Sequence, residues 1–70
     1  MEKYTVSLTK LFTGFNLTVE DFESLVGTTI RATDGVVIGK VVGHNVVRNE
    51  VYCELNADDP RTAKFVENYR

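Results

Sequence analysis

The chain has 70 residues, of which 43% are hydrophobic and 26% charged, and its formal net charge at pH 7 is −2. We expect one domain spanning residues 1–70; a domain this small buries only about 60% of its unfolded surface, so self-association or a protein partner is expected to add stability. The chain has no basic excess that would attract phosphate, which disfavours nucleic acid as a partner, and no apolar run approaches the roughly 18 residues of a membrane span.

Cysteine usage and the first residues indicate the compartment. Cys53 is the only cysteine, so no intrachain disulfide can form. Residues 1–4 lead directly into an alternating pattern and lack the apolar stretch of a signal peptide. We therefore expect a cytoplasmic protein or, if a phage encodes it, one found in the host cytoplasm or the virion.

The first predicted element is a strand over residues 3–10. Tyr4, Val6 and Leu8 alternate with small polar residues, which is typical of a strand with one buried face. The next segment, residues 11–17, is predicted to be a loop. Its large apolar side chains have two interpretations: they close one end of the core, or they form an exposed patch at a protein interface.

A short helix is predicted over residues 18–26, with a threonine cap at its start and Gly27 after its end. Its first turns carry acidic side chains that could be considered metal or catalytic ligands. A solvated helix start is the preferred interpretation, because the sequence supplies no matching ligands elsewhere. The acidic residues are Glu20, Asp21 and Glu23.

β-branched residues predict three further strands, over residues 28–33, 36–47 and 51–55, with the last turn at residues 48–50. Asp34 and Gly35 predict a tight type I′ hairpin between the first two of these strands. Gly39 and Gly43 each predict a bulge, a sharp bend or a close backbone approach in a strongly curled sheet. These glycines lack the strand–loop–helix context of a phosphate-binding loop.

The last predicted element is a helix over residues 60–69. Asp59 is a favourable N-cap, and Pro60 at the first helical position loses no useful hydrogen bond. A helix this short is not stable alone, so it must pack on the strands or on a neighbouring chain.

No catalytic, metal or cofactor site is predicted. His44 and Cys53 are the only histidine and cysteine, and two such residues cannot complete the usual zinc site. A catalytic pair made from them would need an orienting group and an oxyanion cradle. Because a free cysteine inside a strand is usually buried, Cys53 is expected to be unreactive. We expect neither enzyme activity nor a small-molecule substrate.

A resemblance to the PRC-barrel family is carried by Leu25–Ile30 and by Asp34-Gly35-Val36-Val37-Ile38-Gly39-Lys40-Val41. Members of that family often have a Leu-x-Gly-like segment followed by Asp-Gly-x-x-Ile-Gly-x-Val. The resemblance covers residues 25–55 and implies a small SH3-like β-barrel that acts as a docking module, as in a ribosome-maturation factor and a photosynthetic reaction-centre subunit. The first strand and the last helix lie outside the matched pattern, so the family's partners are not carried over.

A second resemblance is to the KOW motif of ribosomal proteins and transcription elongation factors. It is carried by Ile30-Arg31, Gly35, Ile38–Val41 and Val51–Asn56. It implies the same barrel and RNA binding through basic loops, although the charges in this stretch are balanced. Either resemblance implies a mainly β fold with two short helices: a strongly bent antiparallel SH3-like or PRC-like barrel with a C-terminal helix.

The leading functional hypothesis is a non-catalytic protein–protein interaction module that self-associates or docks on a larger assembly. Small phage virion components and inhibitors of host enzymes are often chains of this size. The candidate interface residues are Leu11, Phe12, Phe15, Phe65 and Tyr69. The alternative is binding of RNA or single-stranded DNA, with cationic contacts and one stacking ring. The candidate residues for it are Arg31, Lys40, Arg48 and Tyr52.

Overall fold

The computed structural model describes residues 1–15 and 24–70, except for the side chain of Phe15. Residues 18–23 of the predicted helix, with its threonine cap and acidic residues, therefore lie outside the described residues. The described elements are β1 (Glu2–Ser7), α1 (Leu8–Phe15), β2 (Thr29–Arg31), β3 (Val37–Asn45), β4 (Glu50–Leu55) and α3 (Pro60–Tyr69).

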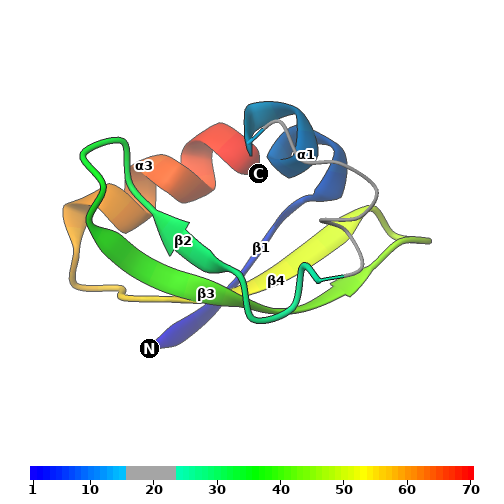
Figure 1. The fold of residues 1–70 in the computed structure, drawn as a ribbon, viewed down its shortest axis with the longest axis horizontal. Helices are drawn as coiled ribbons and strands as arrows, with labels where there is room; N and C mark the ends of the chain where they lie inside the picture. The colour runs from blue at the N-terminus through cyan, green and yellow to red at the C-terminus, as the bar shows by residue number, and fades with distance from the viewer. Residues whose placement is uncertain (16–23) are drawn as a thin grey trace.

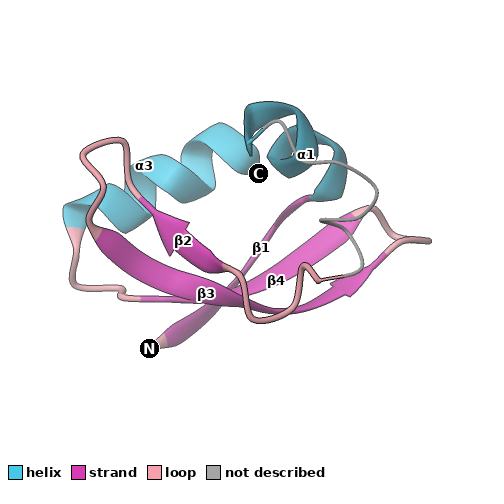
Figure 2. Ribbon diagram, viewed as in Figure 1, coloured by secondary structure: helices cyan, strands magenta, loops and turns pink. Residues whose placement is uncertain are grey.

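The fold has two layers, with the sheet on one side and both described helices on the other (Figures 1 and 2). The four strands are all antiparallel and follow the order β1-β4-β3-β2. The predicted mainly β fold with two helices is confirmed at this level. The sheet is open, with β1 and β2 as its edges, and a closed barrel is not shown.

The core lies between the two layers. Along β4 the exposure of the side chains alternates, so that Val51, Cys53 and Leu55 face the helices and are completely buried. The other core residues are Val6, Leu11, Leu25, Ile30, Ile38, Val41 and Phe65. No helix among the described residues is long and apolar enough to cross a membrane.

The first strand ends three residues earlier than predicted, and α1 replaces both its end and the predicted loop. The Ser7 side chain caps the new helix by accepting a hydrogen bond from the Lys10 amide at 3.3 Å. The apolar residues Leu8, Leu11 and Phe12 recur at helical spacing and pack on the core. The prediction was wrong because Leu8 fits the strand alternation as well as the helical spacing.

A distant residue, Asn49, completes the cap of α1. Its backbone carbonyl accepts from the Leu8 amide at 3.0 Å, and its side-chain oxygen accepts from the Thr9 amide at 3.1 Å and the Thr9 hydroxyl at 2.8 Å. Its side-chain amide donates to the Ser7 hydroxyl at 3.2 Å. Asn49 thus ties the β3–β4 turn to the junction of β1 and α1.

Two substitutions of Asn49 are expected to distinguish the contribution of its cap to stability from the contribution of its backbone conformation. Asn49 has a φ of 56°, which glycine adopts without strain and alanine does not. We expect Asn49→Gly to lower the free energy of unfolding by about 1 kcal/mol through loss of the cap, and Asn49→Ala by about 1 kcal/mol more. Urea denaturation measures both. Equal midpoints for the two variants would contradict the role of the backbone conformation.

The remaining boundaries are close to the predicted ones. The strands predicted over residues 28–33, 36–47 and 51–55 are observed at Thr29–Arg31, Val37–Asn45 and Glu50–Leu55, while residues 24–26 are not helical. The turn predicted at residues 48–50 is observed at residues 46–49, where the Asn49 amide donates to the Val46 carbonyl at 3.1 Å.

The β2–β3 connection is not a type I′ hairpin. The Gly35 amide donates to the Ala32 carbonyl and the Ala32 amide to the Val36 carbonyl, each at 2.9 Å. Gly35 has a φ of 85°, whereas Asp34 does not have a positive φ. This geometry is a three-residue loop with a bulge at the glycine, which Asp-Gly also favours. The prediction identified the turn but not its type.

The predicted helix over residues 60–69 is confirmed as α3. The Asp59 carboxylate accepts from the Arg61 amide at 2.9 Å, and the Arg61 guanidinium in turn binds Asp59 at 2.9 Å and Asp34 at 2.8 Å. Thr62 is buried and donates its hydroxyl to the Asn56 carbonyl at 2.6 Å. These bonds fix the start of α3 over the β2–β3 loop.

Candidate functional site

The predicted interface residues do not form an exposed patch among the described side chains. Leu11 and Phe65 are only 1% and 6% exposed and belong to the core. Phe12 and Tyr69 are half-buried against that core, and the rings of Phe65 and Tyr69 lie 4.8 Å apart. The side chain of Phe15 is outside the described residues. Their apolar character is used mainly to join the helices to the sheet.

The residues of the nucleic-acid alternative lie on different elements. Arg48 approaches the Glu50 carboxylate at 3.5 Å, and the Tyr52 hydroxyl donates to the same carboxylate at 3.1 Å. Burial, followed by the Glu50 carboxylate, raises the pKa of Tyr52. Arg31 donates to the Gly35 carbonyl at 3.1 Å, and Lys40 lies opposite Glu54 in the sheet. Of these cationic side chains, Arg48 lies in an ion pair, Arg31 is bound to a backbone carbonyl, and Lys40 has a carboxylate residue opposite it in the sheet.

Cys53 faces the core, whereas His44 is exposed on β3 opposite Val51. Burial raises the pKa of the Cys53 thiol from 9.0 to about 11, so the thiolate is disfavoured in the folded protein. In the part of the chain that the structure describes, no group of three or more His, Cys, Asp or Glu side chains could hold a metal ion.

The raised pKa of Cys53 gives the stability a dependence on alkaline pH. The unfolded chain releases the thiol proton near pH 9.0, and the folded chain holds it until about 11. The stabilising contribution is thus complete below pH 9.0 and is lost as the pH rises towards 11. We expect the free energy of unfolding to fall more steeply over this range in the native sequence than in Cys53→Ala. Parallel pH profiles of the two proteins would contradict the burial of the thiol.

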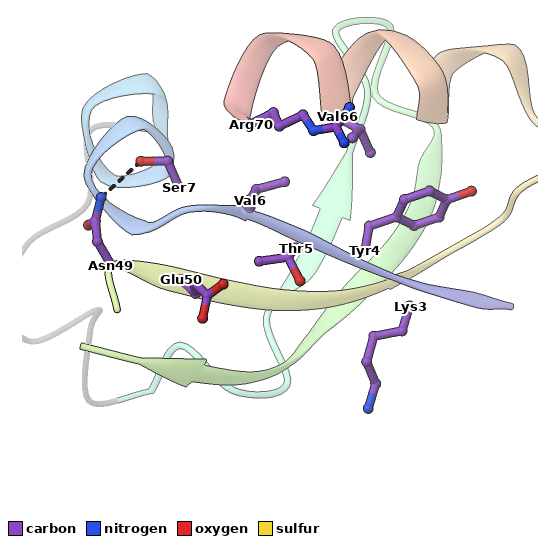
Figure 3. Close-up of a pocket in the computed structure, with 9 residues that line it drawn as sticks. All are labelled: Lys3, Tyr4, Thr5, Val6, Ser7, Asn49, Glu50, Val66 and Arg70. Carbon is purple, nitrogen blue, oxygen red and sulfur yellow. Dashed lines mark hydrogen bonds between the residues drawn. The ribbon is translucent and has the colours of Figure 1, made fainter. Parts of the chain in front are cut away.

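A groove that the sequence did not predict runs along β1 (Figure 3). Its volume is about 630 Å³. Tyr4 and Val6 point from β1 towards α3, whose Val66 and Arg70 form the opposite wall, while Lys3 and Thr5 point to the other face of the sheet. The remaining lining residues are Ser7, Asn49 and Glu50. The groove therefore joins an edge strand to the C-terminal turn of a helix.

Alternate backbone groups of β1 point away from β4 along this groove and pair with no described strand. The Leu8 amide donates to Asn49 in line with the ladder between β1 and β4, so by antiparallel alternation Tyr4 and Val6 direct their backbone groups to β4. The alternate residues, Lys3 and Thr5, direct theirs outward. No described strand lies on that side of β1.

The two edges of the sheet differ in how well they could accept a strand. β2 has three residues, and its register shifts between Ile30 and Arg31, which are features that protect an edge from pairing. β1 has six residues in continuous register with β4 from Glu2 to Ser7, without proline or a bulge. The edge of β1 is the one suited to receive another strand.

A second hollow, of about 440 Å³, lies between α3 and the β2–β3 loop. Its cationic side chains are Arg31, Arg61 and Lys64. Arg61 is already bound to Asp34 and Asp59, so its charge is largely neutralised by the protein itself. The groove along β1 is the stronger candidate site.

The groove could not be found from the sequence, because its position depends on which strands are neighbours in the sheet. The alternation of Tyr4 and Val6 predicts a strand but does not say that it lies at an edge.

Comparison of the chain with protein-family models, with curated proteins and with solved structures gave no match.

Proposed function

We propose that this chain is a protein-interaction module that binds an extended polypeptide segment along β1. The observation that carries the proposal is the regular edge of β1, which pairs with no further described strand, beside a groove of about 630 Å³. A segment that adds to such an edge gains main-chain hydrogen bonds, and its alternate side chains can enter a neighbouring groove.

The lining of the groove suits this mode of binding. Val66 and Tyr4 are half-buried and offer apolar contact on the helix side, and Val6 lies beneath them. Lys3 and Arg70 place positive charge at the groove, while Glu50 is bound by Arg48 and Tyr52. The site therefore combines backbone pairing with an apolar wall and a charged rim.

The broader predictions remain proposals that accompany this one. The relationship to SH3-like barrels of the PRC type, the non-catalytic role, the phage origin and the cytoplasmic location are proposed from the sequence alone. Nucleic-acid binding is the weaker alternative, because Arg48 and Tyr52 both engage Glu50.

The experiment is selection of a displayed random-peptide library against the chain, followed by affinity measurement with two variants of Thr5. Thr5→Val keeps the outward N–H group of the edge, and Thr5→Pro removes it without breaking the ladder to β4. We expect Thr5→Val to bind the selected peptides as the native chain does and Thr5→Pro to lose roughly tenfold or more in affinity. Circular dichroism checks that both variants are folded. Equal affinity for a folded Thr5→Pro would contradict binding at this edge.

A further inference from the structure

We propose that the segment received by β1 is the β1 strand of a second copy of this chain, paired antiparallel about a two-fold axis beside Thr5. This inference rests on the proposed function and names the partner for the same site. In the dimer the two sheets join into one, and both groove walls face the same side.

The alternation of side chains restricts the possible registers. Residues directly opposite each other in an antiparallel pair share a face, and β1 directs Tyr4 and Val6 to one face and Lys3 and Thr5 to the other. A joined sheet with a common core side therefore requires the two-fold axis to lie beside a residue, such as Tyr4, Thr5 or Val6. It cannot lie between two residues.

The chemistry of the side chains selects among these registers. An axis beside Tyr4 places the Glu2 carboxylate opposite Val6 on the core side, where charge is unfavourable. An axis beside Val6 shortens the overlap to residues 5–7. An axis beside Thr5 pairs residues 3–7 and places a β-branched residue opposite itself, which suits a strand.

The core side of this register is an unbroken apolar surface. Tyr4 of each copy lies opposite Val6 of the other, and within each copy these residues already lie opposite Cys53 and Val51 of β4. An apolar row thus crosses the dimer from Cys53 and Tyr4 of one copy to Val6 and Val51 of the other. Tyr4, which is half-buried in the single chain, gains cover from the opposing copy.

The outer side of the same register is complementary in charge. Lys3 of one copy lies opposite Ser7 of the other, and Ser7 lies opposite Glu50 within its own chain. Lys3 also lies opposite Glu54 of its own β4. Each Lys3 is therefore placed between two carboxylates, with only a small serine between it and the one on the other copy. No like charges lie directly opposite each other between the two β1 strands.

The test uses the position that faces itself only in this register. Thr5→Lys and Thr5→Glu each place like charges at the two-fold axis, while a mixture of the two variants places opposite charges there. By sedimentation we expect each variant alone to raise the dimer dissociation constant roughly fivefold or more, and the equimolar mixture to restore dimers. The matched controls Thr29→Lys and Thr29→Glu change an exposed threonine on the other edge, β2, and are expected to leave dimerisation unchanged.

The outcomes distinguish this inference from the proposed function. A native chain that stays monomeric at its highest soluble concentration overturns the second copy as partner, and the proposed function then stands if displayed peptides still require the Thr5 N–H group. A native chain that neither self-associates nor binds any displayed peptide overturns both this inference and the proposed function. Dimers that respond equally to charge at Thr5 and at Thr29 overturn the two-fold pairing of β1.

Discussion

Gly39→Ala is expected to lower the free energy of unfolding by about 3 kcal/mol, the upper end of the usual range for overpacking. A Cβ atom at Gly39 would collide with the backbone carbonyl oxygen of Glu54 and would lie 2.7 Å from Cδ2 of Leu55. Gly39 is held from both sides, because it pairs with Ile30 on β2 and with Leu55 on β4. The nearest atom belongs to the backbone of β4 in the middle of the sheet, so it cannot move away by a rotamer change as a side chain could.

Gly43→Ala is the matched control on the same strand. A Cβ atom there would lie 3.4 Å from Cδ2 of Tyr52, an ordinary contact, and Gly43 does not have a positive φ. We expect a change below about 1 kcal/mol. Urea denaturation of the two variants measures the difference. Similar midpoints would show that β3 and β4 separate easily at Gly39 and would contradict the close approach.

The two glycines also show what a sequence pattern can and cannot specify. Glycines inside the long strand predicted bends or close approaches, and the structure has a close approach at Gly39 and a register shift between Val41 and Gly43. Which glycine has which role depends on the residue of β4 that lies opposite. That pairing is not local in the sequence.

The two helices differ in the same way. For α3, Asp59 and Pro60 are local signals, so its position was predicted correctly. For α1, the spacing of Leu8, Leu11 and Phe12 was available, but the preceding alternation obscured it. Part of its cap comes from Asn49, forty residues away from Thr9. A cap supplied by a distant turn gives no local sequence signal near the helix that it stabilises.

The candidate site was missed for a related reason. The prediction chose the largest apolar side chains as interface residues, yet burying large apolar side chains is also how a small domain builds its core. The proposed peptide site instead depends on the backbone groups of Lys3 and Thr5, which no side-chain pattern reveals. The strand order placed β1 at the edge, and only the folded structure provides that order.

Phe65→Ala is expected to lower the free energy of unfolding by about 3 to 5 kcal/mol, because it leaves a cavity between α3 and the sheet. Phe65 is 6% exposed and belongs to the core cluster, so its removal loosens the packing between α3 and the strands. Native domains are stable by about 5 to 15 kcal/mol, and a chain of this size has a small margin.

The control is Lys64→Ala, an exposed neighbour on α3 whose replacement by another good helix former is expected to change stability by less than about 0.5 kcal/mol. Both variants are compared by urea denaturation at low and high protein concentration. A core role predicts the same loss for Phe65→Ala at both concentrations. An interface role predicts a loss only at high concentration, where self-association stabilises the native chain. A loss of stability seen only at high concentration would support an interface role for Phe65 and would require α3 to move away from the sheet on binding.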